Sequence, residues 1–213
     1  MDVAVLGMGR MGRALAGRLL EGGHQVTVWN RSKGRAGEVV AAGAREADSV
    51  ADAVQGVDVV LTMVANDDAV RAVAFGQLRP SIGDATVYVD SSTVSPGLSA
   101  ELAEAFDPRF LAMPVLGSPA AVNAGQAVFL TGGDASIVDR LGPVISSLTN
   151  TVRRYDSAPL AIAAKLATNL LLLSEVVALA ESFAVGRSEG GCRAAGGHGG
   201  AARLRESGLV RPG

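Results

Sequence analysis

Apolar and polar positions near the start of the chain follow two different periods. Four consecutive apolar residues at 3–6 run into a turn with three glycines, and residues 10–20 then repeat apolar positions at helical spacing. A second apolar run at 25–29 follows a Gly-Gly pair. A continuous apolar run is typical of a strand buried on both faces, and the helical period is typical of an amphipathic helix. The order predicts a βαβ unit.

The same two periods predict the remaining elements. Strands are expected at 57–64, 86–90, 110–112, 126–131 and 151–154, and helices at 33–43, 66–75, 134–148 and, with Pro159 in its first turn, 158–186. Asn66, Ser95 and Asp134 are expected as N-caps, Ser95 for a helix that begins at Pro96. Because strands and helices alternate, we predict an α/β fold of the Rossmann type, a doubly wound and mostly parallel sheet followed by one long helix.

We divide the chain into a dinucleotide-binding domain at 1–156, a long interdomain helix at 157–187 and a tail at 188–213. The tail is rich in glycine, a composition that disfavours stable helices, and we predict that it is disordered. Cys192 and His198 lie in this tail. Two potential ligands in a disordered segment are too few for a metal site, so no metal is expected.

The glycine turn reads Gly-x-Gly-x-x-Gly at Gly7, Gly9 and Gly12. Such a pattern alone is weak evidence, but here a predicted strand precedes it and a predicted helix follows it. In that context Gly7 permits the tight turn, Gly9 lets a pyrophosphate approach the backbone, and Gly12 lets the helix pack on its strand. The phosphates would face the positive end of the helix dipole. We therefore predict a dinucleotide site at this turn.

Composition narrows the class of protein. The chain has 213 residues, 48% of them hydrophobic and 19% charged, with a net charge of −2, so no general attraction to nucleic acid or anionic membranes is expected. One cysteine excludes an internal disulfide and suits a reducing cytoplasm, and no basic leader segment is recognised at the start. The apolar stretch at 166–183 contains two glutamates, and we expect a helix buried between protein surfaces rather than a membrane span.

The end of the second strand indicates which dinucleotide is preferred. A site for NAD usually places an acid there, to accept a hydrogen bond from the ribose 2′-OH, but this chain has Asn30, Arg31 and Ser32 instead. A guanidinium and a hydroxyl suit a 2′-phosphate. We therefore favour NADPH over NADH. Lys33 and Arg35 follow close by, and for these two a solvated basic surface is an equally good interpretation.

Two loops after predicted strands carry candidate ligand contacts. Ser92 and Thr93 follow the strand at 86–90, and Gly117 with Ser118 follows the strand at 110–112. Loops at the carboxyl ends of parallel strands are where ligands bind in open α/β sheets. Ser92 and Thr93 are candidates for contact with nicotinamide or substrate, and Gly117 and Ser118 offer backbone N–H groups.

Lys165 and Asn169 stand four residues apart on the predicted long helix and therefore share one face. Aliphatic residues surround Lys165 in the sequence, and burial among them would lower its pKa from about 10.4 toward the range that proton transfer requires. The alternative is a lysine whose stem lies along the helix while its head reaches solvent.

These motifs, in this order, resemble those of the β-hydroxyacid dehydrogenases, which include 3-hydroxyisobutyrate dehydrogenase, glyoxylate/succinic semialdehyde reductase and 6-phosphogluconate dehydrogenase. The resemblance covers residues 1–187. It rests on Gly-Met-Gly-Arg-Met-Gly at 7–12, Thr-Met-Val at 62–64, Asp-Ser-Ser-Thr-Val-Ser-Pro at 90–96, Met-Pro-Val-Leu-Gly-Ser at 113–118 and Lys-Leu-Ala-Thr-Asn at 165–169.

The resemblance implies a site and a mechanism. Nicotinamide would deliver hydride to a carbonyl carbon while Lys165, as an ammonium, protonates the oxygen and Asn169 holds that oxygen or orients the lysine. Substrate-binding residues would be Ser92, Leu116, Gly117 and Ser118, with the substrate carboxylate held by all of these except Leu116. Cofactor-binding residues would be Gly7, Met8, Gly9, Arg10, Met11, Gly12, Asn30, Arg31, Ser32, Met63, Val64 and Thr93.

The chain departs from the family in two respects. Leu116 stands where the family usually has a serine, so one carboxylate donor is lost and the substrate is expected to differ or to be more apolar. Imine reductases share the architecture but usually lack the lysine, so Lys165 favours a carbonyl. Family members also continue for about another hundred residues as a helical domain. Without it, the chain is either an active reductase or a dinucleotide-binding module without turnover, and the apolar long helix is expected to form a homodimer.

Overall fold

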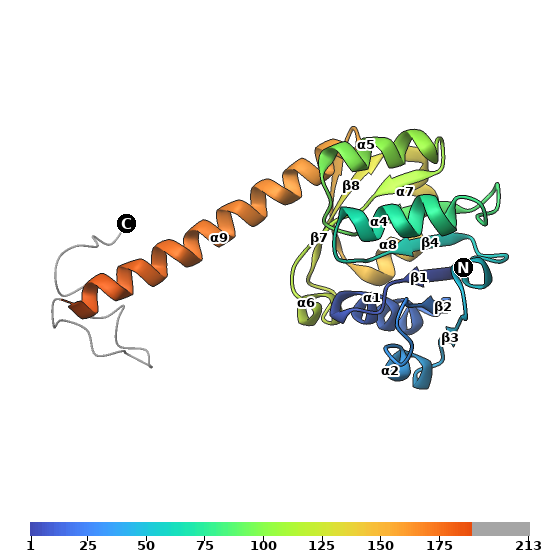
Figure 1. Ribbon diagram of the computed structural model, residues 1–213, viewed down its shortest axis with the longest axis horizontal. Helices are drawn as coiled ribbons and strands as arrows, with labels where there is room; N and C mark the ends of the chain where they lie inside the picture. Colours follow the sequence, from blue (N-terminus) through green and yellow to red (C-terminus); the bar gives the residue numbers. More distant parts are fainter. Residues whose placement is uncertain (189–213) are drawn as a thin grey trace. The chain divides into compact units, whose positions relative to one another are not determined.

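The computed structural model describes residues 1–188, so the predicted tail lies outside the described residues from residue 189 onward, Cys192 and His198 included, while Ser188 ends the long helix (Figure 1). The predicted first unit is confirmed: β1 (Asp2–Leu6), α1 (Arg10–Glu21) and β2 (Gln25–Trp29) form a βαβ unit with parallel strands. Alternate residues of β1 enter two separate hydrophobic cores, Val3 and Val5 one core and Ala4 and Leu6 the other. The strand is therefore buried on both faces, which explains its unbroken apolar sequence.

Within the described residues, the strands form one nine-stranded sheet. Its order is β3-β2-β1-β4-β5-β6-β8-β7, with β9 also paired to β8. The strands from β3 to β6 are parallel, β8 is antiparallel to β6 and β7, and β9 is parallel to β8. The bounds not yet given are β3 (Arg45–Glu46), β4 (Val59–Thr62), β5 (Val87–Asp90), β6 (Phe110–Ala112), β7 (Val115–Leu116), β8 (Val128–Gly133) and β9 (Thr151–Tyr155). The chain thus has the doubly wound, mostly parallel sheet that was predicted.

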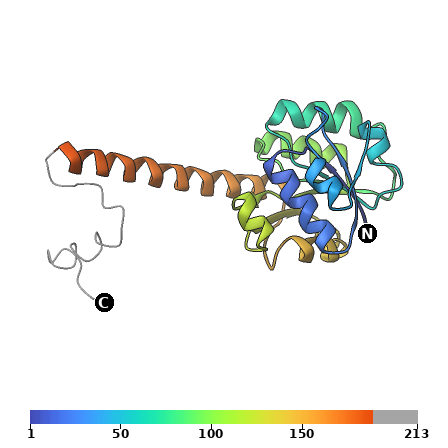
Figure 2. The ribbon, with the colours of Figure 1, turned by 90° about the horizontal axis from the view of Figure 1, so that it is seen from below.

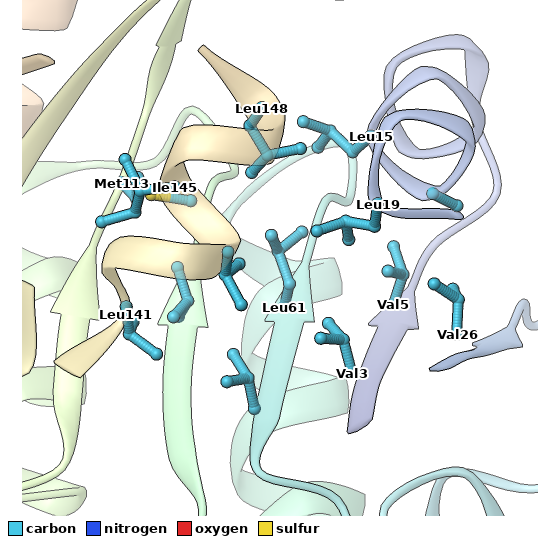
Figure 3. Packing of buried hydrophobic residues seen from close by; sticks show 14 of the residues in the cluster. Val3, Val5, Leu15, Leu19, Val26, Leu61, Met113, Leu141, Ile145 and Leu148 are labelled. Atoms are coloured by element: carbon cyan, nitrogen blue, oxygen red, sulfur yellow. The ribbon is translucent and has the colours of Figure 1, made fainter. Parts of the chain in front are cut away.

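Helices cover both faces of this sheet (Figures 1 and 2). On one face, Leu15 and Leu19 of α1 meet Ile145 and Leu148 of α8 over the side chains of β1 and β4 (Figure 3). On the other face, Val70, Leu98 and Ile162 belong to a second core with Tyr88. The remaining helices are α2 (Gly37–Ala41), α3 (Val50–Ala53), α4 (Asp67–Val73), the π-helical turn η1 (Ala74–Leu78), α5 (Pro96–Ala105), α6 (Pro119–Asn123), α7 (Ala135–Arg140), α8 (Gly142–Leu148) and α9 (Ala158–Ser188).

Two predicted helices are wrong in extent. The helix predicted at 134–148 is two helices, α7 and α8, because Pro143 has no N–H to donate to the preceding turn and its ring crowds that turn. The helix predicted at 33–43 is confined to α2, because Gly34 has φ +79°, a value that an α-helix does not contain. The strands predicted at 57–64 and 126–131 are β4 and β8 with shifted ends, and β3, α3, β7 and α6 were not predicted.

The described chain forms two compact units, the first being Met1–Ala167 and the second beginning at Thr168. The first turns of α9 therefore belong to the unit that contains the sheet. Among the described helices, α9 is the one long and apolar enough to cross a membrane as well, because Ala158–Arg187 contains an 18-residue window with a mean hydropathy of 1.7. Core helices of water-soluble proteins can have the same length and composition. Its side chains beyond Ala167 are largely exposed, with Leu170 at 69%.

Candidate functional site

The glycine turn after β1 is packed against the end of β4. Gly7 has φ +107°, and a Cβ at this position would lie 2.3 Å from the Met63 carbonyl oxygen. A Cβ on Gly12 would lie 1.8 Å from the carbonyl oxygen of Gly7, so any larger residue would push α1 away from its strand. Gly9 has no atom within 4 Å of its Cβ position and faces open space. The three glycines thus have the geometry that was predicted for them.

No side chain within residues 1–188 caps the start of α1. Its N-cap is Gly9, and its first turn contains no acidic residue. By contrast, Asn66, Ser95 and Asp134 cap α4, α5 and α7 as predicted, each by accepting a hydrogen bond from a backbone N–H of its own helix. An uncapped helix start carries partial positive charge and backbone N–H donors, which together suit an anionic pyrophosphate.

A pocket of about 400 Å³ lies at this turn. It is formed at the carboxyl ends of β1, β2 and β4, where the strand order reverses, which is the usual ligand position in open α/β sheets. The predicted cofactor residues that line it are Gly7, Gly9, Arg10, Met11, Gly12, Asn30, Arg31, Met63 and Val64. Residues from three separate segments of the sequence therefore meet around one pocket.

One wall of this pocket was not predicted. Trp29 lines it from the end of β2, and Ala69, Ala72 and Val73 line it from α4. The apolar residues of α4 recur at the three- and four-residue spacing of one helix face, and this spacing was the signal that would have identified them. They give the pocket an apolar side opposite the polar glycine turn.

Both ends of the Asn30 side-chain amide are hydrogen-bonded to the backbone beside the pocket. Its Oδ1 accepts a hydrogen bond from the Met8 N–H at 2.9 Å, and its Nδ2 donates to the Ser32 carbonyl at 2.7 Å. Met8 itself is fully buried. The amide therefore ties the glycine turn to the loop that carries Arg31, while Met8 and Ser32 are placed beside the pocket and do not line it.

The basic residues after β2 differ in their surroundings. Arg31 is exposed, lines the pocket and forms no ion pair within the described part of the chain. Lys33 is exposed and pairs with Asp48 at 2.7 Å, and this hydrogen bond raises the pKa of Lys33. Of Arg31 and Lys33, Arg31 is therefore the one that lines the pocket, where Arg10 also lies, and for Lys33 the structure favours the solvated-surface interpretation.

The loop after β5 places its two predicted residues differently. Ser92 is fully buried, and its hydroxyl accepts a hydrogen bond from the Val64 N–H at 3.0 Å. Thr93 is exposed. The contacts of Ser92 with a substrate and of Thr93 with a cofactor stay predictions. Within the structure, the partner of the Ser92 hydroxyl is the N–H of Val64, a residue that lines the pocket.

Asp90 is the polar residue of this region that sequence reasoning missed. It ends β5, is 1% exposed, and its Oδ1 accepts hydrogen bonds from the Thr62 hydroxyl at 2.5 Å and from the Ser92 N–H at 3.2 Å. Burial raises the pKa of this carboxyl to about 6, against the lowering effect of its hydrogen bonds. An aspartate that ends a run of apolar strand residues was the signal available in the sequence.

Leu116 ends β7, and Gly117 and Ser118 follow it in the loop. Gly117 is exposed with φ +147°, and the Ser118 hydroxyl caps α6 by accepting a hydrogen bond from the Ala121 N–H at 3.2 Å. Leu116 is half-buried. The role of these three residues in holding a substrate stays a prediction.

The first turns of α9 are packed closely on the sheet. Ala158 lines a hollow together with Phe110 and Gly133. A Cβ on Gly132 would lie 2.7 Å from the Cβ of Ala161, so the helix approaches the backbone of β8 directly. The missing side chain of Gly132 is what permits this approach.

This packing indicates where Lys165 lies. Gly132 pairs with Ala112 in the sheet, so α9 passes the end of β6 at Ala161 and runs toward the carboxyl edge. Lys165 follows one helical turn later, about 6 Å further along. It is 8% exposed, and desolvation lowers its pKa. The predicted low pKa is thus supported, whereas Asn169 belongs to the second unit and its role stays a prediction.

Comparison with known proteins identifies the relatives of this chain. Residues 2–156 match the family model described as the NAD binding domain of 6-phosphogluconate dehydrogenase. An uncharacterized oxidoreductase of Bacillus subtilis, YfjR, is 36% identical over 86% of this chain and 66% of its own length. The NAD-dependent L-serine dehydrogenase of Pseudomonas aeruginosa is 31% identical over 89% of this chain and 65% of its own.

The solved structure of Mycobacterium tuberculosis 3-hydroxyisobutyrate dehydrogenase with L-serine is also similar. It superposes with a TM-score of 0.82 at 28% identity, over 93% of this chain and 72% of that chain. The chain spans about two thirds of the length of the curated relatives named above, at 66% and 65%.

The chain contains two lysines, Lys33 and Lys165, which allows a direct test of the site. Lys33 is exposed with a raised pKa, and Lys165 is buried with a lowered pKa. After reductive methylation with carbon-13 formaldehyde, we expect three NMR signals, one from the N-terminal amine and one from each lysine, with the Lys165 signal titrating at lower pH than the Lys33 signal. Lys165→Met and Lys33→Met should each remove one signal and so assign the two lysines. Lysine signals that titrate together would contradict the desolvated placement of Lys165.

Proposed function

Because this chain belongs to the β-hydroxyacid dehydrogenase family, with the family's dinucleotide-binding domain at residues 2–156, we propose that it is an oxidoreductase. It interconverts a small carbonyl acid and its hydroxy acid with NADPH. The observation that carries the proposal is the pocket at the carboxyl ends of β1, β2 and β4, where, within residues 1–188, the start of α1 has no side-chain cap and Arg31 has no ion-pair partner. This donor set fits a phosphorylated dinucleotide.

Separate parts of the chain bind the dinucleotide and orient it for such a reaction. When bound, the dinucleotide supplies the hydride. The glycine turn and the first turn of α1 hold the pyrophosphate, and the Met63–Val64 segment lines the pocket toward the sheet edge. Holding the reactants in a fixed orientation contributes a large part of the rate of a bimolecular transfer.

Lys165 supplies the proton in the reducing direction. Its ammonium group loses a proton more readily than that of an exposed lysine, because burial lowers its pKa. The proton moves from Nζ to the carbonyl oxygen as that oxygen gains negative charge. Asn169 holds the oxygen or orients the lysine, and Gly117, Ser118 and the Ser92 hydroxyl bind the substrate carboxylate.

The preference for NADPH rests on Arg31. This guanidinium lines the pocket with no ion-pair partner in the described chain, at the strand end where an NAD site would carry an acid. A relative that is 31% identical is named for NAD dependence, so the preference for NADPH is argued here from Arg31 and not from that relative.

Two other activities would use the same pocket. An apolar Leu116 in the substrate loop would suit an imine, but imine reductases usually lack the lysine that this chain has at Lys165. A dinucleotide-binding module without turnover would have the same pocket and no reaction. All three would bind the dinucleotide. They differ in what they reduce: a carbonyl acid in the main proposal, an imine in the first alternative and no substrate in the second.

We also propose that the chain pairs with a second copy through α9. The side chains of α9 from Leu170 to Val185 include Leu173, Val176 and Phe183, each more than half exposed in the described structure. Apolar exposure on this scale marks an interaction surface. A two-fold symmetric dimer, in which both copies contribute the same surface, is the commonest arrangement in soluble oligomers.

The pairing predicts a dimer in solution. Light scattering across the micromolar range should give twice the mass of 21.5 kDa. Leu173→Glu together with Val177→Glu should dissociate it, because each partner would bury charge without a counter-ion. A wild-type monomer across this range would contradict the pairing.

The reaction predicts loss of turnover with retention of binding in Lys165→Met. NADPH consumption with glyoxylate, succinic semialdehyde and related aldehyde acids should fall at least about 100-fold, because a general acid contributes about that much or more. Binding of NADPH, followed by quenching of Trp29 in the pocket, should stay unchanged. Lys33→Met is the matched control and should keep full activity. A wild type that binds NADPH but reduces no carbonyl would favour the binding module.

If Arg31 binds the 2′-phosphate, Arg31→Ala should weaken the binding of NADPH and not that of NADH. A lost hydrogen bond between charged groups costs about 1.5 kcal/mol or more, so the Kd for NADPH should rise roughly tenfold or more. The Kd for NADH, which has no 2′-phosphate, should not change, and Arg35→Ala should leave both affinities as they are. Equal losses for both dinucleotides would show that Arg31 does not read the phosphate.

A further inference from the structure

A buried polar network joins the ends of three adjacent strands. The Asp90 side chain accepts hydrogen bonds from Thr62 of β4 and from Ser92 in its own loop, and its main-chain carbonyl accepts from the Met113 N–H at 2.7 Å after β6. Tyr88 shares a further hydrogen bond with Thr62 at 3.1 Å. Each of the four side chains is at most 1% exposed. Asp90 is the acceptor at the centre of this network.

The network reaches the dinucleotide pocket through Ser92. The Ser92 N–H is held by Asp90, and the Ser92 hydroxyl accepts from the Val64 N–H at 3.0 Å. Met63 and Val64 line the pocket, and the Met63 carbonyl lies against the backbone of Gly7. A change at the Asp90 carboxylate would therefore be transmitted through one side chain to the wall of the pocket.

The charges that face Asp90 do not neutralise it. The titratable groups around it are Tyr88 on β5 and Asp67 at the start of α4, and Asp67 raises the Asp90 pKa further. No lysine or arginine within residues 1–188 forms an ion pair with Asp90. The hydroxyl and backbone donors are thus what stabilises its ionised form.

We propose that Asp90 is a positioning residue of the dinucleotide site, and that its ionised carboxylate holds Ser92 and the Met63–Val64 segment in the shape that binds the dinucleotide. The proposal rests on the proposed dinucleotide-binding function. Hydrogen bonds to a carboxylate are about twice as strong as those to a neutral carboxyl, so protonation loosens this wall of the pocket. Dinucleotide affinity therefore falls as Asp90 takes up a proton.

Protonation of Asp90, which lowers dinucleotide affinity in this proposal, has the opposite effect on the stability of the fold, which it raises. The pKa of Asp90 rises from 3.8 to about 6 on folding, so the folded chain binds this proton more tightly than the unfolded chain does. The contribution of Asp90 to stability is therefore greatest below the unfolded value and is lost as pH rises through the folded value.

The test measures NADH binding by quenching of Trp29 between pH 5 and pH 8. NADH is the probe because the 2′-phosphate of NADPH is a phosphate monoester, whose second pKa is about 6 and would obscure the effect. We expect the Kd of the wild type for NADH to be about tenfold higher at pH 5 than at pH 8. The midpoint of this change should lie near the Asp90 pKa of about 6. NADPH should show the same loss in addition to its own titration.

Two variants separate positioning from folding. Asp90→Asn should bind NADH weakly at every pH, while its thermal midpoint at neutral pH stays equal to or above that of the wild type. Thr62→Val keeps the side-chain shape but removes a hydrogen bond that lowers the Asp90 pKa, so the midpoint of the binding curve should move to higher pH. If Asp90→Asn does not fold, the Thr62→Val shift alone decides.

Asp58→Asn is the matched control, because Asp58 precedes β4 at the opposite edge of the sheet, where its carboxylate accepts from the Asp2 N–H at 3.0 Å. Its binding curve should match the wild type. A wild-type Kd for NADH that does not change with pH, or an unmoved midpoint in Thr62→Val, would overturn the role of Asp90 alone. No binding of either dinucleotide at pH 8 would overturn the proposed function itself.

Discussion

The arrangement of the site depends on how closely three backbone segments approach one another at the first turn. A side chain on Gly7 would overlap the Met63 carbonyl, and a side chain on Gly12 would overlap the Gly7 carbonyl. This contact sets the distance between β1, α1 and the end of β4. The pocket at the strand reversal, the uncapped start of α1 and the position of Arg31 all follow from that distance, because each is built on one of these segments or on Asn30, which is bonded to the turn.

A second constraint joins the carboxyl ends of the strands across the sheet. The Asp90 carboxylate and the Ser92 hydroxyl connect β4 with β5, and the main chain of Asp90 continues the connection to Met113 after β6. Parallel strands are joined by crossovers rather than tight hairpins, so these contacts link strand ends that no turn connects. Here the lateral contacts are polar and buried, and the residues that make them also form the edge on which a ligand would rest.

Much of this structure could be predicted from the sequence, and the errors have physical causes. The strands at 25–29 and 110–112 and the caps Asn66, Ser95 and Asp134 were predicted correctly, because periodicity and capping are local properties. The break between α7 and α8 was missed although Pro143 marks it, since the apolar period continues through the proline. Asp90 was missed because its importance lies in partners 28 and 2 residues away, a relation that only the folded chain displays.

The contact between Gly132 and Ala161 changes where a functional boundary can be drawn in this chain. A division at residue 156, directly after β9, respects the sheet but separates it from the turns of α9 that cover it and from Lys165. A minimal module for transplanting into another protein should therefore extend to Ala167, where the first compact unit ends. A fragment that ends at residue 156 would keep the pocket at the glycine turn but lack Lys165, the proton donor of the proposed reaction.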